Sequence, residues 1–236
     1  SPAVAARMSS LERYRPYRDF VNPFTELLHG VFRLAAAEGP ADAERAVALL
    51  RSVAGMVPGN TAVAETLASA ERALGGENET GVTHVFFATG FAPRREAVRI
   101  DLPLVLVNDA VDYVGVSFPQ LVFDDGNDRS IVVEGRGGSS ETEVVADMDR
   151  MVAVEFREEF PTLLTRAIIG AAAKIAASYA VNVSTDEDET VNVLARILAG
   201  LYLLSQNQAD TRAWVSVPKQ FQYARVRTPA DGVVRI

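Results

Sequence analysis

The spacing of apolar residues along the chain changes from helical to alternating and back to helical. Over residues 1–76 the apolar positions recur three and four apart, and Gly75 and Gly76 close this region. From Thr83 the apolar positions alternate with polar ones, which is the period of a half-buried strand. We therefore expect an α+β protein, with helices over 1–76 followed by a domain over 83–236 in which a mainly antiparallel sheet packs with a long helical hairpin.

The N-terminal region is expected to contain helices that include one degenerate repeat unit. Asn22 is a candidate N-cap, and Pro23 suits the first turn, where its missing N–H has no helical partner to lose. Ala46, Leu50 and Pro58 have the spacing that ends the second helix of a tetratricopeptide unit. The turn between the two helices is longer than that repeat requires, so a plain helical bundle stays open as the alternative.

Three segments set the expected sheet topology. His84–Ala88 and the alternating segment Ala97–Leu102 are separated by a Pro-containing turn and predict a β-hairpin. Gln220–Arg227 is expected to return to this sheet, because strands before and after a helical pair imply that the chain end rejoins the earlier strands. The glycines and serines of Gly135–Ser140 predict a flexible connector.

Two long apolar segments predict the helical hairpin, with helices over about 141–182 and 190–206. Ser139 and Ser140 are candidate N-caps for the first helix. Pro161 is expected either to break this segment or to begin a new helix, because it cannot donate an interior backbone hydrogen bond.

A membrane-spanning hairpin is the competing interpretation of the same two segments. A spanning helix requires about 20 uninterrupted apolar residues. Arg166 and Lys174 interrupt the first segment, and Asn192 and Arg196 interrupt the second. We therefore expect the hairpin to be enclosed in a water-soluble fold.

The composition excludes several classes of function. A net charge of −8 and a pI near 4.9 oppose non-specific binding to nucleic acid. Residues 121–160 hold eleven carboxylates and four arginines, so this window carries most of the negative charge and favours a cationic partner over an anionic one. The chain contains no Cys, which excludes disulfides, thiolate nucleophiles and Cys-based zinc sites.

Candidate partner-binding residues lie in a helix, in an acidic loop and beside the sole Trp. They are Phe32, Arg33, Asp124, Asp125, Asp128, Arg212 and Trp214. The loop Asp124–Asp128 has the oxygen-rich composition of a calcium site but lacks the length and the closing Glu of an EF-hand. Trp214 predicts either a core anchor or, if exposed, a binding hot spot. We expect no metal and no cofactor.

No catalytic set can be identified from the residues. His29 and His84 are the only histidines, and neither has the Ser and Asp neighbours of a triad. Paired carboxylates serve glycosidases, but 31 acidic residues leave the pair undefined. The expected function is therefore non-enzymatic, and a carboxylate-dependent hydrolase acting on cell-wall material is the alternative.

Six segments form a distinctive set: Tyr17–Thr25, Arg99–Leu104, Val114–Leu121, Val145–Arg150, Leu164–Ile168 and Asp210–Trp214. As a group they resemble an uncharacterised family of bacterial envelope proteins, typically predicted lipoproteins with tetratricopeptide-like helices ahead of an α+β region. The resemblance covers most of residues 17–236. The family brings no established catalytic residues.

The resemblance implies a location on the periplasmic side of a bacterial envelope and a protein or peptide partner there. It also implies anchoring at the outer membrane through a lipid on the full-length precursor, which must supply the lipid-accepting Cys and the signal segment that this chain lacks. Some relatives belong with activators of cell-wall synthesis, which favours a role in envelope assembly. We expect the N-terminal helices to present the binding groove.

Overall fold

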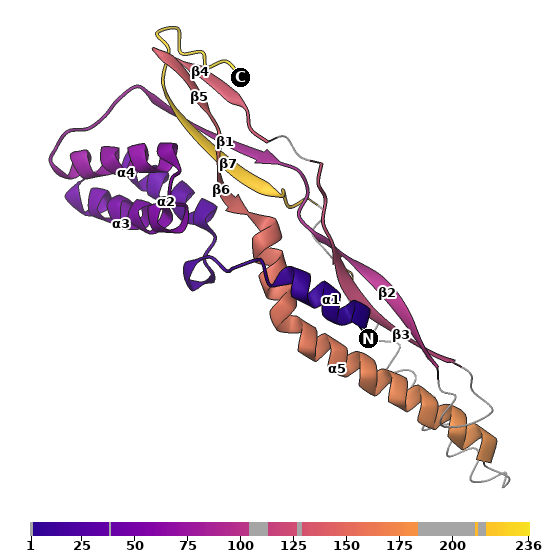
Figure 1. The fold of residues 1–236 in the computed structure, drawn as a ribbon. Helices are drawn as coiled ribbons and strands as arrows, with labels where there is room; N and C mark the ends of the chain where they lie inside the picture. Colours follow the sequence, from indigo (N-terminus) through magenta and orange to yellow (C-terminus); the bar gives the residue numbers. More distant parts are fainter. Residues whose placement is uncertain (1, 38, 104–112, 127–128, 184–210, 212–215) are drawn as a thin grey trace. The chain divides into compact units, whose positions relative to one another are not determined.

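The computed structural model describes residues 2–37, 39–103, 113–126, 129–183, 211 and 216–236, and combines helices with antiparallel sheets (Figure 1). The predicted α+β class is confirmed. The chain divides into two compact units, which are described separately. Unit 1 comprises Ser1–Pro93, Phe123–Val154 and Val215–Ile236, and unit 2 comprises Arg94–Val122 and Glu155–Trp214.

Most of the helical elements of unit 1 precede its strands in the sequence. They are α1 (Pro2–Leu11), the 3₁₀ turn η1 (Arg18–Phe20), α2 (Pro23–Ala35), α3 (Pro40–Met56) and α4 (Thr61–Leu74). The predicted start of α2 is confirmed: the Asn22 side chain accepts a hydrogen bond from the backbone N–H of Phe24, and Pro23 occupies the first turn. Asn60 caps α4 in the same way, by accepting from the N–H of Val63 at 2.9 Å.

A three-stranded antiparallel sheet in the order β1-β7-β6 forms the second layer of unit 1. Its strands are β1 (Val82–Thr89), β7 (Gln220–Arg227) and β6 (Glu143–Asp147). The return of the C-terminal segment to the strand near His84 is confirmed, because His84 lies opposite Arg225 in the β1–β7 register. Strand β7 is therefore the central strand.

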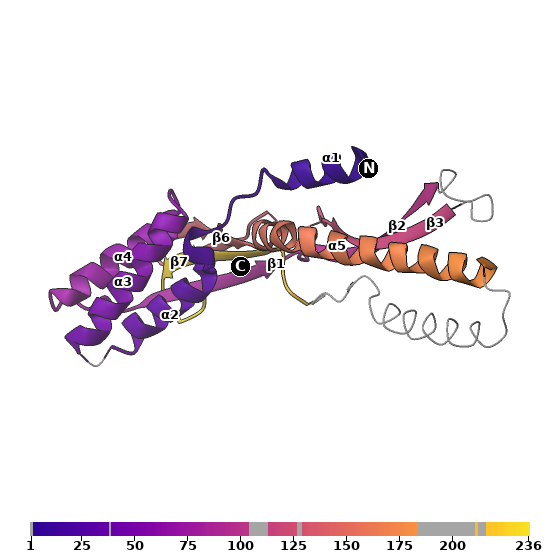
Figure 2. The ribbon, with the colours of Figure 1, turned by 90° about the horizontal axis from the view of Figure 1, so that it is seen from below.

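The helices share one apolar core with this sheet. Phe24 of α2 stacks on Phe221 of β7 and meets Phe86 of β1 edge to face. The buried cluster continues through Leu27 and Leu50 to Tyr223. Figure 2 shows α2, α3 and α4 gathered beside one end of the sheet strands. The helical layer and the sheet thus stabilise each other.

The opposite face of the sheet is covered by the hairpin of β4 (Val132–Gly135) and β5 (Gly138–Glu141). Val133 packs with Ala224 and Val226 of β7 in a second buried cluster. Gly135 is required at the point of closest approach, because a Cβ there would lie 2.6 Å from the Cβ of Val226. Residues 135–140, predicted to be a flexible connector, instead form the end of one strand, a tight turn and most of the next. Their backbone groups pair across the hairpin.

Unit 2 contains an antiparallel ribbon and most of a long helix. β2 (Arg94–Pro103) pairs with β3 (Tyr113–Val122), and α5 runs from Met148 to Val183, with its first residues in unit 1. Within unit 2 the ring of Phe118 on β3 meets that of Phe160 on α5 edge to face. Arg95 of β2 forms an ion pair with Glu159 of α5 at 2.8 Å.

The predicted start of the long helix, near residue 141, is wrong. Glu143–Asp147 forms strand β6, because pairing with β7 buries Val145 and Ala146 completely. The helix starts at Met148, and its N-cap group is the carboxylate of Asp147, which accepts from the N–H of Asp149. Ser139 and Ser140 lie in β5 and cap no helix.

Pro161 neither breaks α5 nor starts a second helix. It lies inside a continuous helix of 36 residues. A proline inside a helix removes one backbone hydrogen bond, which costs about 3 kcal/mol, and the packing of Phe156 and Phe160 in the preceding turns supports the segment. The second predicted helix, over 190–206, lies outside the described residues.

The predicted hairpin between His84–Ala88 and Ala97–Leu102 is also wrong. β1 pairs with β7 and β2 pairs with β3, so the two segments belong to different sheets. Alternation along the sequence identifies a strand but does not select its partner. In the described part of the chain, no helix combines the length and the apolarity that crossing a membrane requires.

Two helical glycines give a matched test of the packing between α2 and α3. A Cβ on Gly30 would lie 2.9 Å from Cγ of the fully buried Leu50, whereas one on Gly55 would meet no atom within 4 Å. We expect Gly30→Ala to lower the unfolding free energy by about 1–3 kcal/mol through overpacking. Gly55→Ala should raise it by about 0.5–1 kcal/mol through helix propensity. Urea titrations of both variants measure this, and equal effects would show that α2 and α3 do not pack as described.

Candidate functional site

The exposed side of α2 carries two large apolar side chains one turn apart. Leu28 is 46% exposed and Phe32 is 66% exposed, while Leu27 and Val31 of the same helix are buried. We call Leu28 and Phe32 the α2 surface. Apolar side chains on both sides of a helix at the protein surface are unusual unless one side meets a partner. Phe32, a predicted partner-binding residue, therefore lies where a partner can reach it.

Arg33, which was also predicted to bind a partner, interacts with other residues of unit 1. Its Nη1 lies 3.2 Å from Oδ1 of Asp42 on α3, and its Nε donates to Nε2 of His29 at 3.1 Å. His29 therefore carries its own proton on Nδ1. The charge of Arg33 is balanced by Asp42, so the flank of the α2 surface is close to neutral.

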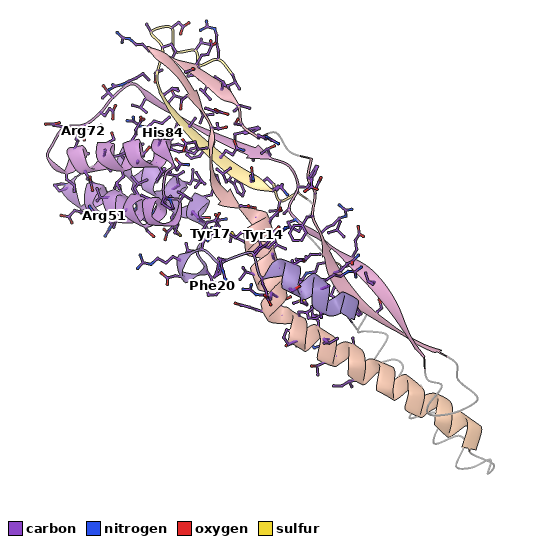
Figure 3. The ribbon with its side chains drawn as sticks, in the orientation of Figure 1. Tyr14, Tyr17, Phe20, Arg51, Arg72 and His84 are labelled. Atoms are coloured by element: carbon purple, nitrogen blue, oxygen red, sulfur yellow. The ribbon has the colours of Figure 1, made fainter. Side chains whose placement is uncertain are left out.

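A second exposed aromatic side chain precedes α2. Phe20 is 64% exposed, and both Asp19 and Phe20 adopt the left-handed conformation, with φ values of 54° and 56°. Two successive non-glycine residues in this region cost about 1–2 kcal/mol each. The segment is held by Tyr17, which Figure 3 labels together with Phe20. The Tyr17 ring lies under the guanidinium of Arg150, and its hydroxyl accepts from the N–H of Asp147 at 3.0 Å.

The acidic loop beginning at Asp124 lies at the start of α5 and binds an ammonium group of the protein itself. Nζ of Lys219 donates both to the backbone carbonyl of Asp124 and to the carboxylate of Asp149. The side chain of Asp124 accepts from the N–H of Gly126 at 2.9 Å and closes the turn. Asp124 is thus used structurally, and the neighbouring Asp125 is exposed.

Asp149 is the carboxyl group whose ionisation is most hindered in this loop region. Burial raises its pKa, the charges of Asp147 and Asp125 act in the same direction, and the Lys219 ammonium opposes them. Its Oδ1 is buried and meets no hydrogen-bond partner in the part of the chain that the structure describes, whereas Oδ2 pairs with Lys219. Among the described residues, no group of three or more acidic or His side chains is arranged to hold a metal ion. Asp128, Arg212 and Trp214 lie outside the described residues.

A buried chain of polar side chains joins β1, β7 and α4, and no sequence pattern predicted it. The hydroxyl of Thr66 donates to the carbonyl of Ala62 at 2.7 Å, so it accepts from the hydroxyl of Tyr223, also at 2.7 Å. Tyr223 must then accept from Nδ1 of His84, at 2.6 Å. His84 therefore carries a proton on Nδ1, and both hydroxyls of this polar chain have partners. Spacing could not have revealed this, because Thr66 and Tyr223 are 157 positions apart.

This polar chain is built for stability rather than reaction. Burial lowers the pKa of His84 to about 4, and the nearby positive charge of Arg225 adds to the effect. Burial raises the pKa of Tyr223 to about 12. Neither group changes protonation near neutral pH, so neither is suited to general acid or base catalysis there.

Glu79 lies in the connection from α4 to β1. It holds the side chain of Arg225, the cation next to the polar chain of Thr66, Tyr223 and His84. It accepts from the Ser69 hydroxyl and from Arg225, and it pairs with Arg72 at 3.1 Å and Arg227 at 3.0 Å. Burial opposes its ionisation, but the Ser69 hydrogen bond and the charges of Arg225 and Arg227 outweigh burial and lower its pKa. Glu79 is therefore an ionised structural anchor.

Comparisons of the chain with family models, with curated proteins and with solved structures found no match. The function must therefore be argued from the geometry above. Of the predicted partner-binding residues, Phe32 is accessible, Arg33 and Asp124 are engaged within unit 1, and Asp125 is exposed beside the Lys219–Asp149 pair.

The depressed pKa of His84 predicts how stability depends on pH. As pH falls below about 6.5, the unfolded chain binds a proton at His84 that the folded chain does not bind until pH is near 4. The unfolding free energy should therefore decrease as pH falls across this interval. His84→Gln should flatten this decrease relative to the wild type. Denaturant titrations from pH 4 to 7 measure both slopes, and parallel curves for the wild type and His84→Gln would contradict the assignment.

Proposed function

We propose that this chain is a non-enzymatic protein-binding scaffold or accessory factor of a bacterial envelope, and that the α2 surface contacts its protein or peptide partner. The observation that carries the proposal is the exposure of Leu28 and Phe32 on a helix whose other side is already filled with apolar contacts. Aromatic side chains such as Phe32 and Phe20 supply large contact areas at interfaces.

The side of the helical layer that faces the sheet is not available as a groove. Phe24 meets Phe86 and Phe221, and Thr66 of α4 bonds Tyr223, so strands β1 and β7 cover it. A partner must therefore use the outer side of α2. This changes the expected binding mode from an open concave groove to an exposed helix face.

The same proposal includes the cellular location of the protein and the repeat type of its N-terminal helices. We take α2 and α3 as one degenerate tetratricopeptide-like unit, and the close approach of Gly30 to Leu50 supports this because helices in such a pair need a small residue at their crossing. The sequence resemblance supports a periplasmic location, and a lipid anchor on a longer precursor would place the protein at the outer membrane.

Replacing the α2 surface should abolish partner binding without unfolding the protein. We expect Leu28→Ser with Phe32→Ser to lose the proteins that the wild-type chain captures from envelope extract, since truncating central apolar contacts costs about 2 kcal/mol or more each. Quantitative mass spectrometry of the captured proteins measures the loss. Removing residues 1–76 is not a suitable test, because it would expose the core shared with the sheet.

The matched control is Leu74→Ser, which changes a side chain of similar exposure at the end of α4. It should retain every captured partner, and thermal unfolding should show that all variants fold. Equal capture by the α2 double variant and the wild type would rule out the α2 surface as the binding site.

Hydrolysis of cell-wall material is the second candidate function, favoured by Asp149 alone. A buried carboxyl group with a raised pKa suits a general acid, and Asp147 and Asp125 are carboxylates near enough to influence it. If this function is present, the protein should release soluble fragments from purified peptidoglycan, and Asp149→Asn should abolish the release. Asp231→Asn, at an exposed ion pair, should not affect it. Absence of fragments over the pH range 4–7 would exclude this candidate.

A further inference from the structure

Strand β1 lies at the edge of the sheet, and its outer side has no partner in the part of the chain that the structure describes. The strand order is β1-β7-β6, and the backbone pairing described for Val82–Ala88 is with β7. Unpaired edge strands are templates for pairing with another strand. The strand is eight residues long, which is longer than the commonest strand length of about 5–6 residues.

The register identifies the backbone groups on the free side. The N–H of Thr228 donates to the carbonyl of Gly81 at 2.8 Å, so this pair at the end of β1 and β7 is a hydrogen-bonded one. Hydrogen-bonded and non-hydrogen-bonded pairs alternate in antiparallel sheets. The backbone groups that point outward from β1 therefore belong to Val82, His84, Phe86 and Ala88.

The other edge of the same sheet, by contrast, is engaged by side chains of unit 1. Strand β6 is five residues long and has an irregularity between Val144 and Ala146. The Val144 carbonyl accepts from the Asn60 side chain, and the N–H of Asp147 donates to Tyr17. In contrast, β1 has no Pro, no bulge and no Lys, Arg, Asp or Glu, which are the usual devices that prevent edge pairing.

We propose that two copies of this chain associate by antiparallel pairing of their β1 strands. A second copy fits this edge because β1 carries no formal charge when His84 is neutral, so two copies meet there without charge repulsion. One symmetric register uses all four outward residues: His84 lies opposite Phe86 of the other copy, and Val82 lies opposite Ala88. Val85 then lies opposite its own copy on the two-fold axis.

This register keeps both faces of the sheet consistent across the dimer. Residues directly opposite each other in a β ladder project to the same face. His84 and Phe86 both project toward the helices, and Val85 projects toward the β4–β5 hairpin. The dimer is therefore one continuous six-stranded sheet, with eight backbone hydrogen bonds at its centre and both cores unchanged.

Single cysteines test the register directly, because the chain contains none of its own. Opposite residues in a non-hydrogen-bonded pair have Cα atoms about 4.5 Å apart, which suits a disulfide. We expect Val85→Cys to form a covalent dimer under mild oxidation. Thr83→Cys should not, because Thr83 lies opposite Phe87 of the other copy and is displaced from its own copy by four residues, or about 13 Å.

A charge on the edge tests the association in solution. Ala88 is exposed and lies opposite Val82 of the other copy, so Ala88→Lys should raise the dimer dissociation constant by roughly tenfold or more. Ala48→Lys, which adds the same charge at an exposed position of α3, should leave it unchanged. Sedimentation equilibrium measures the dimer dissociation constant. The measurement uses about 0.15 M salt, where the Debye length is about 8 Å, so that repulsion between the acidic chains is screened.

The outcomes separate cleanly. A concentration-dependent dimer that Ala88→Lys weakens and that Val85→Cys traps supports the proposal. A wild-type chain that stays monomeric up to its solubility limit overturns the proposal. The proposal is overturned even if the β1 edge then pairs with a strand of another protein, because it names a second copy of this chain. A dimer that Ala88→Lys leaves intact, or that Thr83→Cys traps as readily as Val85→Cys, overturns it as well.

Discussion

The fold of unit 1 depends on Tyr223, a fully buried side chain on the central strand that contacts both layers. Its ring stacks on Phe86 and His84 of the neighbouring strand. Its hydroxyl reaches Thr66 of α4. A buried hydroxyl without a partner would cost about 1–3 kcal/mol, so the helices and the sheet can come together only in the arrangement that satisfies it. This requirement orients the helical layer on the sheet.

Two buried ion pairs also fix β7 to other parts of the protein. Arg225, within the strand, pairs with Glu79, and Lys219, just before it, pairs with Asp149. Each pair connects β7 to a segment distant in the sequence, namely the connection after α4 and the first turn of α5. Breaking such a pair leaves an uncompensated charge, which is costly in a low-dielectric interior. The two pairs therefore stabilise the position of β7 between these segments.

Two parts of that surface remain open in different ways. The α2 surface offers apolar side chains, whereas the edge of β1 offers backbone donors and acceptors. The first suits a partner with its own side-chain pocket, and the second suits an extended strand in a fixed register. They lie on different elements of unit 1, so a self-association through β1 does not require the contacts that the α2 surface would make with a partner.

The sequence by itself determined the local features, because these depend on neighbouring residues. The cap at Asn22, the first-turn position of Pro23 and the extent of the strand Gln220–Arg227 all follow from residue type and period. The α+β class follows from the same periods. The apolar pattern predicted one helix face from six residues: Phe24, Leu27, Leu28, Val31, Phe32 and Leu34. The structure buries Leu27 and Val31 but leaves Leu28 and Phe32 exposed, and the pattern did not identify the strands that cover the buried part.

Apart from the return of Gln220–Arg227 to the strand at His84, only the tertiary structure decided which segments meet. Val144–Ala146 has apolar residues that suit a helix or a strand, and pairing with β7 selects the strand. The same competition gives β1 the partner β7 instead of β2. The polar chain from His84 through Tyr223 to Thr66 joins residues that no spacing rule connects. Long-range strand pairing depends on how much apolar surface the whole core buries. No single segment of the sequence determines that total, because residues from distant segments contribute to it.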